Sequence, residues 1–173
     1  MLNLFRWRKP PNTVALNQPG LTFTPIDEEG LAIYGSWFSD DELRHRIEPP
    51  TRRWFDYVRH TPGCFAWLVH EEDIPVALVQ LDTDSGGNGS VALVVRPDLR
   101  RRGYGTRVLR ALLQRPEVLA LGCVEAEVEV DNLAGIRCAE AAGFVRQGPE
   151  ADGEGFWRLV GFPGGGHMRR LEE

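Results

Sequence analysis

The fold is best predicted from one stretch of the sequence, Val94-Val-Arg-Pro-Asp-Leu-Arg-Arg-Arg-Gly-Tyr-Gly-Thr106. It leads from an apolar segment through a loop with glycine at positions 103 and 105 into a segment with helical periodicity. A helix N-terminus presents unpaired backbone N–H groups and the positive end of the helix dipole, and glycine lets an anion approach that backbone closely. Three consecutive arginines at 100–102 add positive charge beside it. The stretch therefore predicts a strand, loop and helix that cradle a pyrophosphate group.

Two common phosphate-binding motifs do not match this loop. A Walker loop needs a lysine after its second glycine, and this loop contains no lysine. The dinucleotide-binding fingerprint needs a third glycine where this chain has Val108. That fingerprint also follows the first strand of its fold, whereas this loop follows a later strand. What remains is the pattern Arg100-x-x-Gly103-x-Gly105. The alternative interpretation is a basic turn that only caps a helix.

The segments around this loop predict a mixed α/β fold built on one sheet. Period-two patterns and apolar runs predict strands at 21–25, 64–69, 76–81, 90–95 and 124–130, and a closing hairpin at 144–147 and 156–160. The strand at 90–95 is apolar almost throughout, so we expect it to be buried on both faces. Helical patterns follow Asp27, run from Ser39 (with Glu42 as a capping box) to about Ile47, and cover 51–60, 103–115 (ended by Pro116) and 132–142.

The chain reads as one domain, 20–162, with an N-terminal arm at 1–19 and a C-terminal tail at 163–173. With 42% hydrophobic and 26% charged residues, its composition is that of a globular protein. No apolar run approaches the roughly 20 residues of a membrane helix, and the net charge of −5 argues against a nucleic-acid partner. The three cysteines leave one unpaired under any disulfide scheme, and none lies in a CxxC motif. This predicts a reducing compartment and no cysteine metal site. We expect a cytoplasmic protein, with a homodimer as a possible assembly.

Two linked motifs resemble those of the GNAT superfamily of N-acetyltransferases. The pattern Arg100-x-x-Gly103-x-Gly105 after Val-x-Pro is similar to the loop with which this superfamily binds the pyrophosphate of acetyl-CoA. The segment 132–144 resembles the superfamily's NxxAIxxYExxGF segment and matches it at Asn132, Ile136, Glu140, Gly143 and Phe144. The stretches Ile136-Arg-Cys138 and Gly143-Phe-Val-Arg-Gln-Gly148 also resemble the sequences of aminoglycoside 6′-N-acetyltransferases. The resemblance covers about residues 64–160, whereas the first 60 residues match only in the order of elements.

The resemblance implies a fold and a cofactor site. The fold would be a central, mostly antiparallel sheet with splayed fourth and fifth strands, flanked by helices. Acetyl-CoA would be the co-substrate, with its pantetheine arm in the gap between these strands. Carried over position by position, the cofactor-binding residues are Leu93, Val94 and Val95 on the strand, Arg100, Arg101, Arg102, Gly103, Tyr104, Gly105 and Thr106 in the loop, and Asn132 after the next strand.

The resemblance also implies direct attack of an amine on the thioester, which needs a base for the amine and a donor for the departing thiolate. Glu127 lies where several members of the superfamily place a catalytic carboxylate. The alternative is that Glu125, Glu127 and Glu129 only solvate an exposed strand face. At the position of the superfamily's usual acid, a tyrosine, this chain has Ala139. Either the thiolate leaves without a protein donor, or water, Tyr34 or Tyr57 fills in, or catalysis is lost.

Two functions are therefore open: an N-acetyltransferase acting on a small molecule or protein, or a non-catalytic acyl-CoA-binding or regulatory module that lost the acid. Substrate recognition would fall to the helices at 27–60 and the 82–89 loop. There, an aromatic and acidic pocket for an amine is one interpretation, and ordinary core aromatics with solvated acids are the other. The residues concerned are Trp37, Phe38, Trp54, Phe55 and Tyr57, with Asp40, Asp41, Glu42 and Asp56.

Overall fold

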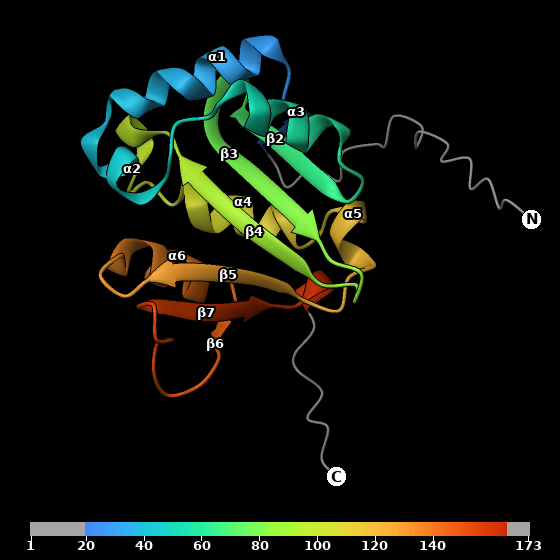
Figure 1. The fold of residues 1–173 in the computed structure, drawn as a ribbon, viewed down its shortest axis with the longest axis vertical. Helices are drawn as coiled ribbons and strands as arrows, with labels where there is room; N and C mark the ends of the chain where they lie inside the picture. The colour runs from blue at the N-terminus through green and yellow to red at the C-terminus, as the bar shows by residue number, and fades with distance from the viewer. Residues whose placement is uncertain (1–19, 166–173) are drawn as a thin grey trace, which may run out of the picture.

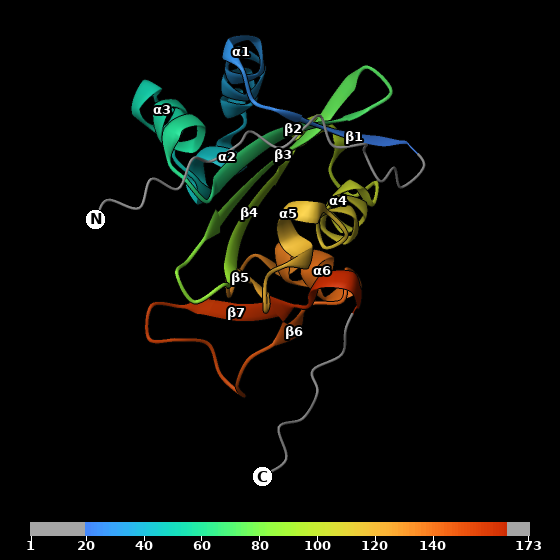
Figure 2. The same cartoon turned by 90° about the vertical axis from the view of Figure 1, so that its right-hand side faces the viewer.

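The computed structural model describes residues 20–165 as one sheet with helices on both faces (Figures 1 and 2). The predicted arm at 1–19, and the predicted tail from residue 166 onward, lie outside the described residues. The strands are β1 (Leu21–Pro25), β2 (Cys64–Glu71), β3 (Ile74–Thr83), β4 (Gly89–Val95), β5 (Val124–Glu129), β6 (Val145–Arg146) and β7 (Phe156–Gly161). The helices are α1 (Glu28–Ser36), α2 (Asp41–Arg46), α3 (Arg52–His60), α4 (Tyr104–Leu112), α5 (Pro116–Leu119) and α6 (Leu133–Ala141), with 3-10 turns η1 (Trp37–Ser39), η2 (Pro97–Leu99) and η3 (Pro163–Gly165).

The sheet is mostly antiparallel, with one parallel pair of strands. Its strand order is β1-β2-β3-β4-β5-β7-β6, and every neighbouring pair is antiparallel except β4 and β5. Within residues 20–165, β4 and β5 pair only at Gly89↔Val124 and Ser90↔Glu125. Beyond these pairs the two strands diverge (Figure 1). The mostly antiparallel sheet and the splayed fourth and fifth strands are confirmed.

The helices form one layer on each face of the sheet. Helices α1, α2 and α3 lie on one face and α4, α5 and α6 on the other (Figure 2). Side chains alternate along β4, so Val91 and Leu93 pack with the α4 layer and Val94 packs with the α1 layer. The prediction that this strand is buried on both faces is wrong, because Ala92 is exposed. Ser90 lies on the same face and is exposed as well, although it pairs with β5, so it is the helices on the α1 side that do not cover this part of β4.

Local capping signals located most helix starts, with one shift. Asp27 caps α1 as predicted, its Oδ1 accepting from the Gly30 N–H at 2.8 Å. The predicted capping box at Ser39 is wrong, because Ser39 ends the η1 turn and Asp40 is the cap residue of α2. The Asp40 carboxylate accepts from the Leu43 N–H at 2.8 Å. Asp40 lies three residues before Leu43, whose N–H has no partner within the helix, and this spacing is the one that an N-cap requires.

The helix after the cradle ends earlier than predicted. Helix α4 ends at Leu112 rather than near residue 115, and Pro116 begins the short helix α5 instead of following a helix end. Proline suits a first helical position, where its missing N–H would have no partner in any case. Further on, the N–H of Gly164 donates to the Leu113 carbonyl at 3.0 Å, so the first residues of the predicted tail are bonded to the domain.

Candidate active site

The start of α4 is an uncapped helix end. Side chains cap α1, α2, α3 and α6, through Asp27, Asp40, Thr51 and Asn132. The cap residue of α4 is Gly103, which has no side chain to offer and adopts the left-handed conformation at φ 80°. The first N–H groups of this nine-residue helix therefore donate no hydrogen bond to a capping side chain. They are donors available to an anion.

The two glycines of the loop, Gly103 and Gly105, are required for different physical reasons. A Cβ built on Gly103 would find no atom within 4 Å, so this position faces open space. A Cβ on Gly105 would lie 2.6 Å from the sulfur of Cys138, because α4 packs closely against α6 there. Gly103 thus keeps the backbone accessible in a conformation that favours glycine, whereas Gly105 allows two helices to approach.

The four side chains of the loop divide into two pairs. Arg100 donates from Nη2 to the Asp40 carboxylate at 2.8 Å, and the Tyr104 hydroxyl donates to Oε2 of Glu71 at 2.5 Å. These two side chains attach the loop to α2 and to the end of β2. Arg101 and Arg102 are exposed, and neither forms an ion pair within residues 20–165. The free positive charge of the cradle therefore comes from Arg101 and Arg102.

We expect Asp40→Ala to lower the free energy of unfolding by about 1 kcal/mol at pH 7, because α2 loses its cap and Arg100 its partner. The Leu43 N–H, and next the Arg100 guanidinium, hold the pKa of Asp40 below its ordinary value. A lowered folded-state pKa gives stability that is present at neutral pH and is lost as the pH falls through that pKa. Thermal unfolding at pH 7 and pH 3 measures this. The difference between wild type and variant should shrink at pH 3, and the neighbouring Asp41→Ala should show a smaller effect.

The free edge of β4 turns backbone groups toward the gap. The Gly89 N–H donates to the Cys123 carbonyl on the β5 side at 2.9 Å, and the Arg96 N–H donates to Val76 on the β3 side at 2.9 Å. Backbone direction alternates along a strand, so Leu93 and Val95 direct their N–H and C=O groups into the gap. The backbone of Val94 faces β3 instead, and its side chain reaches the α1 layer. Leu93 and Val95 are thus placed to bond an extended chain between the strands.

Asn132 lies at the far side of the gap, between β5 and α6. Its Oδ1 accepts from the Gly135 N–H at 2.9 Å, which makes it the cap residue of α6. Its Nδ2 donates no hydrogen bond within the described part of the chain. The side chain is half-buried, so this amide can serve the helix with its oxygen and a ligand with its nitrogen.

The three glutamates of β5 have different surroundings. Glu125 pairs with Arg158 of β7, and Glu129 pairs with Arg46 of α2. Glu127 is exposed and forms no ion pair within residues 20–165. It shares the α1 side of the sheet with Glu129, because side chains two apart lie on one face of a strand. Glu127 is therefore the carboxylate of this face that remains available to a substrate.

The position of the missing tyrosine is closed. Ala139 is only 2% exposed and packs in the core cluster on the α4 side. Cys138 lies against Gly105, and burial raises the pKa of its thiol, which keeps it protonated at neutral pH. Of the three tyrosines, Tyr104 already donates its hydroxyl to Glu71, which leaves Tyr34 and Tyr57. Burial raises the pKa of Tyr34, and Cys64, burial and Asp82 together raise that of Tyr57 to about 12. Both side chains therefore keep their proton at neutral pH.

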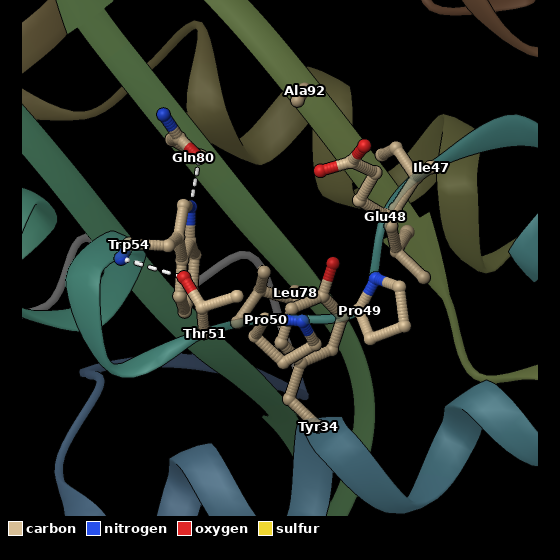
Figure 3. Close-up of a pocket in the computed structure, with 11 residues that line it drawn as sticks. Tyr34, Ile47, Glu48, Pro49, Pro50, Thr51, Trp54, Leu78, Gln80 and Ala92 are labelled. Atoms are coloured by element: carbon tan, nitrogen blue, oxygen red, sulfur yellow. Dashed lines mark hydrogen bonds between the residues drawn. The ribbon is translucent and has the colours of Figure 1, made fainter.

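A pocket of about 340 Å³ lies on the α1 side of the sheet, beside the free edge of β4 (Figure 3). Its lining includes two residues that the sequence did not single out, Glu48 and Gln80. Gln80 could have been noticed as a polar residue within an apolar strand, and Glu48 directly precedes Pro49-Pro50. The lining residues are Tyr34, Ile47, Glu48, Pro49, Pro50, Thr51, Trp54, Leu78, Gln80, Ala92 and Val94.

The predicted aromatic and acidic pocket is formed only in part. Trp37, Phe38 and Phe55 are buried in the core, whereas Trp54 lines the pocket. Tyr57 is exposed, with its hydroxyl 3.5 Å from Asp82. No group of three or more His, Cys, Asp or Glu side chains in residues 20–165 is arranged to hold a metal ion.

Comparisons with known proteins agree with this geometry. The acetyltransferase (GNAT) family profile matches residues 31–144. The chain is 26% identical over 140 residues to the uncharacterized N-acetyltransferase YfmK of Bacillus subtilis (strain 168), covering 80% of this chain and 94% of that protein. The fold is shared with aminoglycoside acetyltransferase AAC(6′)-Ib in complex with coenzyme A, at 21% identity and a TM-score of 0.67, covering 82% and 94% of the two chains. Spermidine N-acetyltransferase from Vibrio cholerae in complex with CoA and spermine has 15% identity and a TM-score of 0.71, with 84% and 97% covered. The chain belongs to the acetyltransferase (GNAT) family.

Proposed function

We propose that this protein is an acetyl-CoA-dependent N-acetyltransferase that moves an acetyl group to a primary amine by direct attack on the thioester. The observation that carries the proposal is the uncapped N-terminus of α4, with Gly103 facing open space and Arg101 and Arg102 unpaired beside it. This anion cradle opens next to a strand edge that is free because β4 and β5 diverge. A pyrophosphate with an extended arm has the shape and charge that suit both features.

The chain's own residues fit each part of acetyl-CoA, which supplies a thioester as the acetyl donor. The N–H groups at the start of α4 and the guanidinium groups of Arg101 and Arg102 hold the pyrophosphate. The backbone of Leu93 and Val95 bonds the pantetheine arm along the free edge of β4. The Nδ2 group of Asn132 donates to the arm from the β5 side. Arg100 and Tyr104 act indirectly, since their side chains hold the loop in place.

Glu127 is the base in this proposal. An alkylamine carries a proton at neutral pH and must lose it before its nitrogen can attack a carbonyl. Among the three glutamates on this face of β5, Glu127 is the one that forms no ion pair within residues 20–165, although it lies opposite Arg158 of β7. The departing thiolate takes its proton from water or from a phenol, for which Tyr34 in the pocket is the better placed of the two tyrosines.

A second candidate function rests on Ala139. This residue fills the place of the superfamily's tyrosine with a buried methyl group, and no phenol can reach the site from there. A protein that kept the cradle and lost the acid would bind acyl-CoA without turnover. That protein would be a regulatory or acyl-CoA-binding module rather than an enzyme.

Turnover with a panel of primary amines separates the two functions. We expect acetyl-CoA to bind, which calorimetry measures, and free CoA to be released when an accepted amine is added. Binding without CoA release from any amine or lysine-containing peptide would favour the non-catalytic module. Absence of CoA binding would contradict both functions and return the basic turn to a purely structural role.

In the described part of the chain, no helix combines the length and the apolarity needed to cross a membrane. A cytoplasmic location, a homodimer and the absence of a nucleic-acid partner stay predictions. The arginines that could have served a nucleic acid are partly engaged: Arg52 pairs with Glu28 and Asp56, and Arg100 pairs with Asp40.

A further inference from the structure

The pocket on the α1 side meets β4 where that strand is free. Ala92 and Val94 of β4 line it, and Leu93 between them turns its backbone into the gap between β4 and β5. A ligand in this pocket would therefore lie across the strand edge from the extended arm that the gap accommodates. This juxtaposition puts the pocket at the reacting end of the proposed acetyl donor.

Only one charged residue lines the pocket, and it is Glu48. The other four acidic residues between positions 40 and 56 are each engaged by an arginine. Within residues 20–165 Glu48 forms no ion pair, and its carboxylate extends toward Ala92 (Figure 3). The engaged pairs are Asp40 with Arg100, Asp41 with Arg44, Glu42 with Arg46, and Asp56 with Arg52.

Apart from Thr51 and Gln80, the rest of the pocket wall is apolar or aromatic. The rings of Tyr34 and Trp54 lie 5.6 Å apart with an angle of 47° between their planes. Trp54 is fixed by its indole N–H, which donates to Oε1 of Gln80 at 2.8 Å (Figure 3). The N–H of the indole is therefore already satisfied by Gln80. Gln80 is itself held in place because it donates to Asp82 at 2.7 Å. Trp54 therefore offers an apolar ring face, not a donor, to whatever occupies the pocket.

From these observations we infer that the pocket is the acceptor site, that Glu48 recruits the amine as its ammonium ion, and that the acceptor is a monoamine on a compact apolar or aromatic body. The inference rests on the proposed function, since it places the acceptor for that reaction. An alkylammonium ion gains a charge-assisted hydrogen bond from Glu48 and favourable contact with the two aromatic rings. Glu127, on the same face of the sheet, then accepts the proton before attack.

Charge and size both select against polycations. A polyamine or an aminoglycoside bound through Glu48 would set its further ammonium groups against Ile47, Pro49, Pro50 and Leu78, where no described carboxylate lines the wall. An ammonium group without a partner in an apolar site costs free energy. The volume of about 340 Å³ also lies at the small end of the range for ligand pockets.

Acetylation of 2-phenylethylamine, spermidine and kanamycin, measured by CoA release, tests the inference. We expect the wild-type kcat/KM to be at least about tenfold higher for 2-phenylethylamine than for either polycation. Glu48→Gln should raise the KM for 2-phenylethylamine about tenfold while kcat stays within about twofold, as expected for a lost ionic hydrogen bond in binding. The matched control is Glu29→Gln, which removes the same charge from an exposed position of α1 outside this pocket and should leave both constants unchanged.

Calorimetry gives a readout that does not depend on turnover. Titration of 2-phenylethylamine into the CoA-saturated protein should show binding that weakens about tenfold in Glu48→Gln, with CoA affinity the same in both proteins. An unchanged KM in Glu48→Gln, a loss confined to kcat, or a preference for spermidine or kanamycin would overturn the inference while leaving the acetyltransferase in place. Failure of the wild type to bind CoA would instead contradict the proposed function.

Discussion

Replacing Gly103 with valine is expected to weaken CoA binding by about 100-fold or more, which in practice abolishes it. Gly103 adopts φ 80°, a conformation that costs a β-branched residue roughly 1–3 kcal/mol, so the loop must rearrange. The valine side chain would also project into the open space in front of the α4 N-terminus. The N–H groups that hold the pyrophosphate would then be displaced or screened, and each hydrogen bond to a charged group is worth about 1.5–3 kcal/mol.

Gly87→Val is a closely matched control for this experiment. Gly87 lies in the β3–β4 hairpin loop at φ 79°, and a Cβ there also finds no atom within 4 Å. The two substitutions therefore impose similar backbone strain, one at an exposed and one at a half-buried position. Calorimetry with CoA measures binding, and thermal unfolding measures stability. If Gly103→Val bound CoA as tightly as wild type, or Gly87→Val lost binding equally, the assignment of the cradle would be wrong.

Glu127→Gln is expected to lower kcat by about 10²–10⁴-fold while CoA affinity hardly changes. The substitution keeps the size of the side chain and removes its ability to take a proton. Glu127 is exposed and forms no ion pair within residues 20–165. The substitution therefore removes no ion pair, and the free energy of unfolding should stay the same. The measurement is turnover at saturating acetyl-CoA and amine, with CoA titrated separately.

Glu125→Gln and Glu129→Gln distinguish a base from a diffuse acidic face. Glu125 already neutralises Arg158, and Glu129 already neutralises Arg46, so neither carboxylate is free to accept a proton from the amine. We expect both variants to retain most of the wild-type kcat. Equal losses in all three variants would mean that the strand face only attracts the cationic substrate. Combined with Glu48→Gln, the series should separate a KM effect at Glu48 from a kcat effect at Glu127.

The strand, loop and helix of the cradle could be predicted because their signals are local. An apolar run predicted β4, the pair of glycines predicted an open turn, and the apolar positions after Thr106 predicted α4. The Asp27 cap was predictable for the same reason, since a capping side chain bonds an N–H two or three residues away. Where two residues could each cap, as at Ser39 and Asp40, the pattern alone did not choose. The η1 turn uses Ser39 and leaves the capping position to Asp40.

Burial and pairing needed the folded chain. The sequence shows an apolar strand at 90–95, but the exposure of Ala92 depends on how the helices of the α1 side lie over the sheet, where Ala92 lines a pocket instead of packing against them. Likewise, Pro116 looks like a helix end, and only the turn after Leu112 shows that it begins a new helix.

The fold family and the cradle could be recognised from neighbouring residues alone, because strand periodicity, glycine positions and helix caps act between neighbours in the chain. The tertiary structure decided which acidic side chains are free to act. Glu125, Glu127 and Glu129 are equivalent in the sequence, but Arg46, 83 residues before Glu129, pairs with Glu129, and Arg158 pairs with Glu125. Glu127 is left without an ion pair within the described residues. Glu48 is marked in the sequence only by the two prolines that follow it, and it becomes the lone charge of a pocket only once α2, α3 and β4 have packed together. Ion pairing depends on distance in space, which chain neighbours do not encode.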